Sequence, residues 1–248
     1  MYTQVKYCKI VGKRDIAKNQ VELLLENETL AKEAQPGQFV HINIGSDKHI
    51  LRRPISICDA YDNITRIVFE IKGDGTEILS KKNVGEIIDL LGPLGTGFTV
   101  KKDLKAVVLG GGLGSFPLLY LAKNLTNPKI FLGFRDKEMV CMEEDFSQCG
   151  ETVIATDNGT YGYNGFAINA AKEAMDDCDI IYACGPTPML KAVKQIAEEK
   201  GIKAEISMEQ RMGCGIGACL VCVCKTHSGY DKVCQKGPVF DAKEVIFE

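Results

Sequence analysis

Hydrophobic and polar residues alternate over several short stretches in the first hundred residues. The period of two is clear in residues 20–25 and 39–44 and looser in residues 65–71. Turn-forming pairs such as Pro36-Gly37 separate these stretches. Because short strands must pair widely to bury one face, this region is expected to form a small closed antiparallel β-barrel, with a sandwich as the alternative.

Three further signals complete this region. Residues 73–75 predict a glycine-rich turn, and a short helix follows over residues 76–82. Residues 86–91 predict the last strand, which closes at Gly92-Pro93.

The pattern changes after residue 101, where short apolar strands alternate with helical segments. Strands are expected at residues 106–109, 129–134, 152–155, 179–184 and 203–207. Helices are expected at residues 116–124, 143–149, 166–175 and 188–200. This alternation predicts a parallel sheet with helical crossovers, an architecture typical of nucleotide-binding domains.

The remaining segment, from Met208 to the end, is rich in glycine and cysteine and too short to bury a core of its own. The predicted fold is therefore multi-domain. It has a β-barrel over residues 1–100, an α/β nucleotide-binding domain over residues 101–207 and a small cluster-binding domain over residues 208–248.

Composition narrows the possible functions. The chain has 248 residues, of which 45% are hydrophobic and 25% charged, with a formal net charge of −3. This composition is that of a globular protein without the basic surface of a nucleic-acid binder. The N-terminal residues lack the apolar stretch of a signal peptide, and the longest uncharged stretch is too short and glycine-rich to span a membrane. A cytoplasmic protein is expected.

Eleven cysteines are the anomaly, and four of them are spaced as ligands. Cys214, Cys219, Cys222 and Cys234 follow a C-x4-C-x2-C…C pattern. This spacing is typical of plant-type [2Fe–2S] ferredoxins. Small residues around Cys219 allow backbone N–H groups to approach the sulfur atoms of a cluster.

Three other interpretations of the cysteines remain open, and in one of them the cysteines bind no metal. Four thiolates can also hold structural zinc, although zinc sites more often use two Cys-x2-Cys pairs. Cys224 competes with Cys222 for the third position, but the two-residue gap favours Cys222. His227 lies in the loop before the last ligand, where a lone histidine more often faces solvent.

Three further motifs suit cofactor binding. Residues 53–56 read Arg-Pro-Ile-Ser, in which an arginine beside a proline-fixed turn can anchor a pyrophosphate. Residues 109–114 form a glycine turn between a strand and a helix, where backbone amides can approach phosphates. Residues 184–186 read Cys-Gly-Pro at the carboxyl end of a strand. Each motif alone also fits an ordinary turn or helix start.

Together these motifs, with Gly-Pro-Leu-Gly at residues 92–95, resemble the ferredoxin–NADP reductase superfamily. Within it, residues 207–219 and 233–240 look like the signature of the electron-transfer subunits of type B dihydroorotate dehydrogenases. The resemblance covers nearly the whole chain.

The resemblance implies a flavin barrel, an NAD domain and a [2Fe–2S] domain. The residues that it places against FAD are Arg53, Pro54, Ile55, Ser56, Val68, Phe69, Glu70, Gly75 and Thr76. Glu70 departs from the family, which often has arginine there, and a carboxylate would repel a pyrophosphate. The residues that it places near NAD are Gly111, Gly112, Thr156, Asp157, Gly159, Cys184 and Gly185. A solvated turn at Asp157 is equally compatible with the sequence.

The function implied by the resemblance is electron transfer in pyrimidine (UMP) biosynthesis. A partner subunit would oxidise dihydroorotate on FMN, and electrons would pass through the cluster and FAD to NAD⁺. Chemistry carried by cofactors needs no acid–base pair in this chain, and none is evident. The family also implies a heterotetramer of two catalytic and two electron-transfer subunits.

Other functions remain possible from the sequence. Related subunits with the same modules include NADH-dependent ferredoxin reductases, sulfide dehydrogenases and hydrogenase diaphorases. A zinc-stabilised interaction protein is the non-enzymatic alternative. Arg135 could meet the 2′-phosphate of NADPH, whereas Asp136 would disfavour it, and the resemblance favours NAD.

Overall fold

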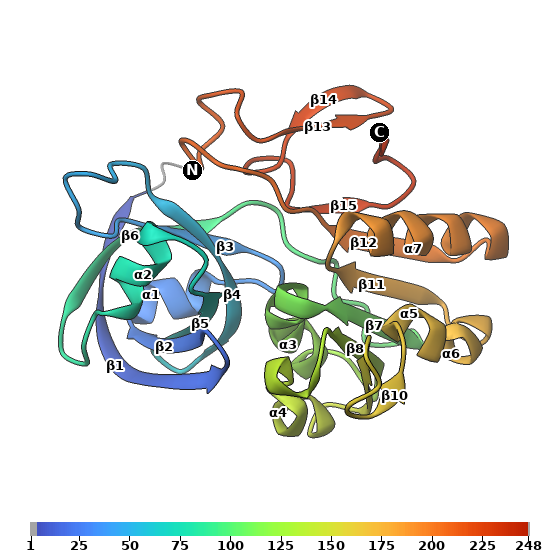
Figure 1. The fold of residues 1–248 in the computed structure, drawn as a ribbon. Helices are drawn as coiled ribbons and strands as arrows, with labels where there is room; N and C mark the ends of the chain where they lie inside the picture. The colour runs from blue at the N-terminus through green and yellow to red at the C-terminus, as the bar shows by residue number, and fades with distance from the viewer. Residues whose placement is uncertain (1–3, 248) are drawn as a thin grey trace.

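A computed structural model describes residues 4–247, and its N-terminal part is a closed barrel of six antiparallel strands (Figure 1). The strands follow the order β1-β2-β5-β4-β3-β6 around the barrel. Their bounds are β1 (Val5–Ala17), β2 (Gln20–Glu26), β3 (Phe39–Ile42), β4 (Arg53–Tyr61), β5 (Ile64–Glu70) and β6 (Ile87–Leu94). Side chains such as Leu23, Val40 and Ile67 fill the barrel core. The predicted barrel is confirmed.

Two local predictions in this region are wrong. Residues 53–56 do not form a turn but begin strand β4, where proline near a strand start fits the extended backbone. Gly75 does not lie in a turn but inside helix α2 (Asp74–Ser80), which begins earlier than expected. The other barrel helix, α1 (Glu28–Glu33), begins where the Asn27 side chain accepts a hydrogen bond from the Leu30 N–H.

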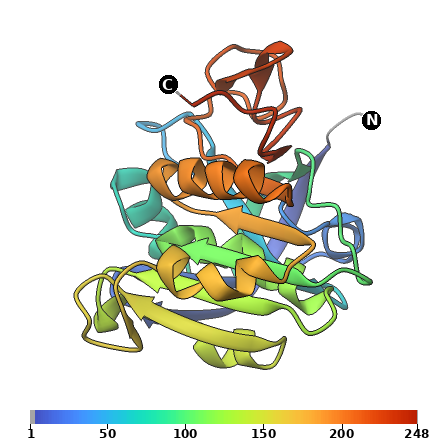
Figure 2. The ribbon, with the colours of Figure 1, turned by 90° about the vertical axis from the view of Figure 1, so that its right-hand side faces the viewer.

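The second part is a sheet of seven strands in the order β10-β9-β8-β7-β11-β12-β15 (Figure 2). Six of them run parallel, namely β7 (Ala106–Gly111), β8 (Lys129–Phe134), β9 (Glu151–Thr156), β10 (Tyr163–Asn164), β11 (Ile180–Cys184) and β12 (Lys203–Ser207). The predicted parallel sheet is confirmed.

Helices cover both faces of this sheet. On one face α3 (Phe116–Lys123) and α4 (Glu143–Ser147) pack against side chains such as Val108 and Tyr182. On the other face α5 (Ala167–Ala170), α6 (Lys172–Asp176) and α7 (Thr187–Lys200) pack against side chains such as Val107 and Ile181. The single helix expected over residues 166–175 divides at Ala171. Two 3-10 turns, η1 (Gly112–Ser115) and η2 (Lys137–Met139), complete the domain.

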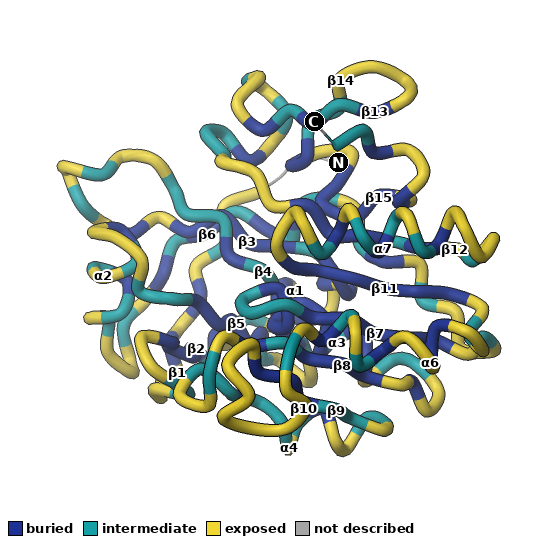
Figure 3. Tube along the Cα trace, turned by 45° about the vertical axis from the view of Figure 1, so that its right-hand side comes forward, coloured by how far each residue is buried: buried dark blue, intermediate teal, exposed yellow. Residues whose placement is uncertain are grey.

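The C-terminal segment lies beside both other parts. It forms a hairpin of β13 (Val223–Thr226) and β14 (Gly229–Lys232), and then β15 (Val239–Asp241) pairs antiparallel with β12. Thr96, after the barrel, bridges to Pro238. Buried residues therefore continue from the sheet into the C-terminal segment (Figure 3). Among the described residues, no helix is both long and apolar enough to cross a membrane.

Candidate functional site

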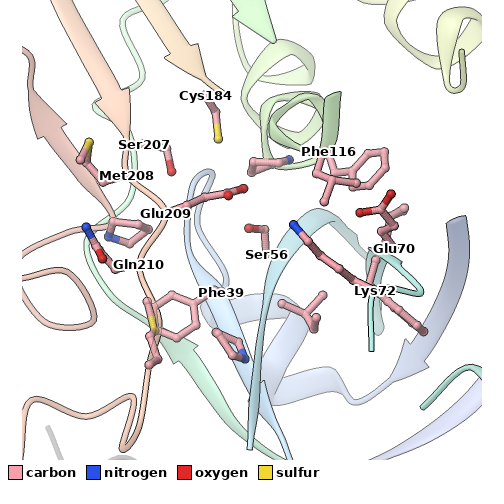
Figure 4. A pocket seen from close by; sticks show the side chains of 18 of the residues that line it. Phe39, Ser56, Glu70, Lys72, Phe116, Cys184, Ser207, Met208, Glu209 and Gln210 are labelled. Carbon is pink, nitrogen blue, oxygen red and sulfur yellow. The ribbon is translucent and has the colours of Figure 1, made fainter. Parts of the chain in front are cut away.

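A pocket of about 510 Å³ lies between the barrel, the sheet and the chain that follows β12. This volume is within the range of cofactor sites. Of the residues predicted to contact FAD, those that line it are Pro54, Ile55, Ser56, Val68, Phe69, Glu70 and Thr76. Cys184, predicted to lie near NAD, lines the opposite side (Figure 4). Ser56 faces Phe39 across the β3–β4 pair, so two adjacent strands supply this wall.

The other two residues predicted to contact FAD lie next to each other. The Arg53 guanidinium packs so closely on Gly75 that a Cβ at residue 75 would collide with it. Beside them, Thr76 Oγ1 accepts hydrogen bonds from the N–H groups of Lys72, at 2.9 Å, and Gly73, at 3.2 Å. The start of α2 is therefore tightly built around one arginine.

Charged side chains meet in the pocket. Glu70 and Lys72 line it from the end of β5, and the Lys72 side chain extends toward Ser56 (Figure 4). Glu209 enters from the chain after β12. The Lys72 ammonium partly offsets the negative charge that Glu70 brings to this site.

The nicotinamide-side motifs come together at the carboxyl ends of β7 and β11. Cys184 pairs in register with Gly110, and a Cβ on Gly185 would lie 3.1 Å from Gly111 Cα. Burial, followed by the nearby negative charge of Glu209, raises the pKa of Cys184 to about 12. The Cys184 thiol is therefore protonated at neutral pH.

The turn after β9 holds the remaining predicted NAD residues. Thr156 Oγ1 donates to the Tyr161 carbonyl at 2.7 Å, and the Gly159 N–H donates to the Thr156 carbonyl at 3.0 Å. Asp157 is exposed, and partial burial raises the pKa of its carboxyl. None of these three residues, nor Gly111, Gly112 and Gly185, is among those that line the pocket described above.

The four predicted metal-ligating cysteines lie in two linked pairs. Cys214 Sγ and Cys219 Sγ are 3.3 Å apart. The Cys234 N–H donates to Cys222 Sγ at 3.4 Å, and the Gly217 N–H donates to Cys234 Sγ at 3.2 Å. No three His, Cys, Asp or Glu side chains within residues 4–247 are gathered to hold a single metal ion. Two pairs of thiols suit a cluster of two irons, each held by two cysteines.

The backbone around these cysteines favours thiolate formation at one of them. Burial acts to raise the pKa of Cys214, but hydrogen bonds from the N–H groups of Ile216 and Cys219 outweigh it and lower the pKa to about 6. The thiolate is the form that binds iron. N–H groups directed at sulfur are also the donors that tune a cluster.

The two neighbouring residues considered as ligands lie elsewhere. Cys224 is buried in β13 opposite Asp231, and burial raises the pKa of its thiol to about 11. His227 is exposed in the turn after β13. Neither makes any of the hydrogen bonds that link the other four cysteines.

Sequence reasoning missed one wall of the pocket. Ser207, Met208, Glu209, Gln210, Arg211 and Met212 all line it, and two residues later the same segment reaches Cys214. They belong to the stretch 207–219 that carries the family resemblance, but nothing in their pattern marks them as a pocket wall. The pocket and the cysteine loop are therefore continuous along the chain.

A barrel joined to a parallel-sheet domain, with a pocket between them and a four-cysteine loop beside it, defines a reductase of the ferredoxin reductase type. A solved chain of an NADH-dependent reduced ferredoxin–NADP oxidoreductase is similar, with a TM-score of 0.85 and 30% identity over 96% of this chain and 89% of that one. The ferredoxin reductase of a carbazole 1,9a-dioxygenase has the same fold, with a TM-score of 0.68, 21% identity and coverage of 82% and 67%.

Sequence relatives identify the family within this class. Residues 209–246 match the iron–sulfur cluster binding domain of dihydroorotate dehydrogenase B. The chain is 43% identical to the electron transfer subunit of dihydroorotate dehydrogenase B (NAD(+)) from Geobacillus sp. (strain WCH70), over 96% of each. It is 44% identical to the same subunit from Bacillus pumilus (strain SAFR-032), over 96% of this chain and 97% of that one. The chain belongs to this family of electron transfer subunits.

Family membership confirms several expectations from the sequence. The predicted family, the oxidoreductase class and an electron-transfer role linked to NAD⁺ are confirmed. The set of cofactors, FAD with an iron–sulfur cluster and NAD, is confirmed at the level of family and fold. As an electron transfer subunit, the chain works with a catalytic partner.

Proposed function

We propose that this chain transfers electrons to NAD⁺ from a partner subunit, which contains FMN and oxidises dihydroorotate. The reaction would belong to pyrimidine biosynthesis in the cytoplasm. The supporting observation is the segment from Ser207 to Cys214, which lines the pocket and then supplies the first cysteine of the loop. A cofactor in the pocket and a cluster on the loop would therefore be neighbours. When bound, a [2Fe–2S] cluster carries single electrons and FAD converts them into a hydride equivalent.

Residues from the barrel would hold FAD. Phe39, Val68 and Phe69 offer apolar walls to the flavin ring, and the Ser56 hydroxyl offers a hydrogen bond to its edge. Arg53 and the N–H groups at Gly75 and Thr76 suit the pyrophosphate, because a guanidinium and a helix start both favour anions. Lys72 adds a second cation.

Residues at the carboxyl ends of the parallel strands would hold NAD. Gly111 and Gly185 pack closely against each other and Met189, whereas Gly112 has open space at its Cβ position. The neutral thiol of Cys184 can contact a nicotinamide without bringing charge. Thr156, Asp157 and Gly159 suit the ribose. Arg135 Nε lies 3.1 Å from Asp136 Oδ2, so its guanidinium is already paired and NADH is favoured over NADPH.

Cys214, Cys219, Cys222 and Cys234 would hold the cluster as two pairs of thiolates. Three apolar side chains on this loop are exposed: Ile216 by 49%, Leu220 by 72% and Val221 by 54%. We define these three as the loop patch. A catalytic subunit that covers the loop patch would exclude water and approach the cluster closely. Two such pairs of subunits would form a heterotetramer.

The test is reconstitution of the full chain with the catalytic subunit. We expect equal amounts of FAD and cluster per chain, and reduction of NAD⁺ that depends on dihydroorotate. Leu220→Asp should weaken binding to the catalytic subunit by at least about tenfold, which is about 1.4 kcal/mol. It should leave reduction of an artificial acceptor by NADH unchanged.

Tyr7→Asp is the matched control, because Tyr7 is 68% exposed on β1 and is not part of the loop patch. It should leave the complex intact. A colourless chain that contains zinc, or a complex that forms equally well with Leu220→Asp, would contradict the proposal.

A further inference from the structure

His41 is a buried polar residue between the barrel and the cysteine loop. It lies in β3 and is 1% exposed. Its neighbours Val40 and Ile42 point into the barrel core. Phe39, two residues earlier on the same face as His41, packs in the cluster of side chains that includes Cys222 and Cys234. The imidazole is therefore on the outer face of the barrel, beneath the C-terminal segment.

The loop backbone rests directly on the imidazole. A Cβ at residue 215 would collide with His41 Nδ1, and Gly215 has a φ of +71°. The ring also lies beside the backbones of Cys214 and Arg52. Residue 215, which follows the first cysteine of the loop, must therefore be glycine, because its positive φ and its contact with His41 leave no room for a side chain.

Neither ring nitrogen of His41 has a hydrogen-bond partner of normal geometry among residues 4–247. Buried polar atoms almost always have one, and an orphan costs free energy. In every protonation state an imidazole carries at least one N–H. An N–H without a partner of normal geometry therefore lies against the Cys214–Gly215 backbone, in the loop where Cys214 would bind iron.

The strand neighbours of His41 line the flavin pocket. His41 pairs in register with Pro54, and Phe39 pairs with Ser56. Phe39, Pro54 and Ser56 all line the pocket. His41 therefore neighbours a residue of the flavin pocket, Pro54, and also contacts the cysteine loop at Gly215.

We propose that His41 is a positioning residue for the cluster: its imidazole fixes the Cys214–Gly215 segment against the flavin barrel and donates a hydrogen bond to the cluster at Cys214. This inference rests on the proposed iron–sulfur function. A hydrogen bond to a cluster sulfur stabilises the more negative, reduced state, so His41 raises the reduction potential.

The first experiment uses the unaltered chain with its cluster, grown with ¹⁵N-labelled histidine. The chain has three histidines. His49 lies 3.4 Å from Asp74, and His227 is exposed in the hairpin turn. Pulsed EPR of the reduced cluster should show coupling to ¹⁵N and to an exchangeable proton. The coupling should persist in His49→Gln and His227→Gln, and its absence in the unaltered chain would overturn the proposal.

The second experiment compares variants at His41. His41→Leu removes the donor, and His41→Asn keeps an N–H near the position of Nδ1. His41→Leu should disfavour cluster reduction about tenfold, a fall of about 59 mV for one electron. His41→Asn should recover most of this. An unchanged potential in His41→Leu would overturn the proposal.

The outcomes separate this inference from the proposed function. A chain with an intact cluster but no histidine coupling contradicts the role of His41 alone. A chain that holds no iron contradicts both. If His41→Leu fails to assemble a cluster, the ¹⁵N coupling measured in the labelled unaltered chain still tests the role of His41.

Discussion

Arg66 in the barrel donates hydrogen bonds to both carboxylate oxygens of Asp145 in helix α4, at 3.0 and 3.1 Å. The Arg66 side chain is only 6% exposed, and its Nε also pairs with Glu22 of the barrel. This ion pair joins the proposed flavin domain to the proposed NAD domain. A second pair, Lys123 with Asp59, crosses the same boundary.

Removing the Asp145 carboxylate should destabilise the chain. Asp145→Asn leaves Arg66 buried with fewer charged partners, although Glu22 remains. We expect a loss of about 1.5–3 kcal/mol in the free energy of unfolding, the usual contribution of a hydrogen bond to a charged group. Urea unfolding measures it. Glu138→Gln, at an exposed pair with Lys18, is the control and should change stability by no more than about 0.5 kcal/mol. Equal losses of unfolding free energy in both variants would show that the buried pair stabilises the chain no more than the exposed pair does.

Adding one methyl group at Gly75 should disturb flavin binding. The Arg53 guanidinium occupies the space that a Cβ would take, so Gly75→Ala must displace it. We expect FAD affinity to fall at least about tenfold, or about 1.4 kcal/mol, as measured by fluorescence titration. Gly73→Ala is the control, because nothing lies within 4 Å of its Cβ position. Normal FAD affinity in Gly75→Ala would rule out the role of Arg53.

Cys184 should act as a neutral thiol. Its pKa is raised by burial to about 12, so the folded chain keeps the thiol protonated where the unfolded chain, with a pKa near 9, would ionise it. The stabilising contribution is therefore complete below pH 9 and is lost as the pH rises from 9 to about 12. The rate at which NADH reduces the flavin should therefore show no pH-dependent step from thiol ionisation between pH 6 and 9. Cys184→Ala should slow this step without creating a new pH dependence, and a step near pH 8 that Cys184→Ala abolishes would contradict the assignment.

Asp136 should control nucleotide preference. Its pairing with Arg135 Nε, which also lowers the pKa of Asp136, places a carboxylate beside the guanidinium that a 2′-phosphate would need. Asp136→Ser should free Arg135 and shift the ratio of NADPH to NADH efficiency upward about tenfold, which is about 1.4 kcal/mol of transition-state stabilisation. Rapid mixing with each nucleotide tests this. Asp136→Ser/Arg135→Ala should cancel the gain, and a gain that survives in the double variant would show that Arg135 is not involved.

The features that the sequence predicts best are local ones. The strand, glycine turn and helix over residues 106–123 and the spacing of the four cysteines depend on residues close together in the chain. Strand β1 escaped prediction because only Cys8 and Ile10 among its thirteen residues are buried. Its pairing with β2 also shifts register after Ile10 and after Asp15, which breaks the alternation.

Long-range contacts account for the rest. Glu209 and the residues around it have an irregular backbone, so no periodicity marks them as a pocket wall. His41 sits within a strand that is buried on both faces, where one polar residue among apolar ones carries no signal of its own. Both sites form only when segments far apart in the chain meet.

The most direct test of the central claim is anaerobic reduction of the full chain by NADH, with flavin absorbance and the EPR signal of the cluster recorded on one sample. The account predicts that NADH bleaches the flavin and reduces the cluster in the unaltered chain and in Cys224→Ser. In Cys222→Ser, which loses a ligand, the flavin should bleach with no cluster signal. A chain without iron, a flavin that NADH does not bleach, or a cluster that survives in Cys222→Ser and disappears in Cys224→Ser would contradict it.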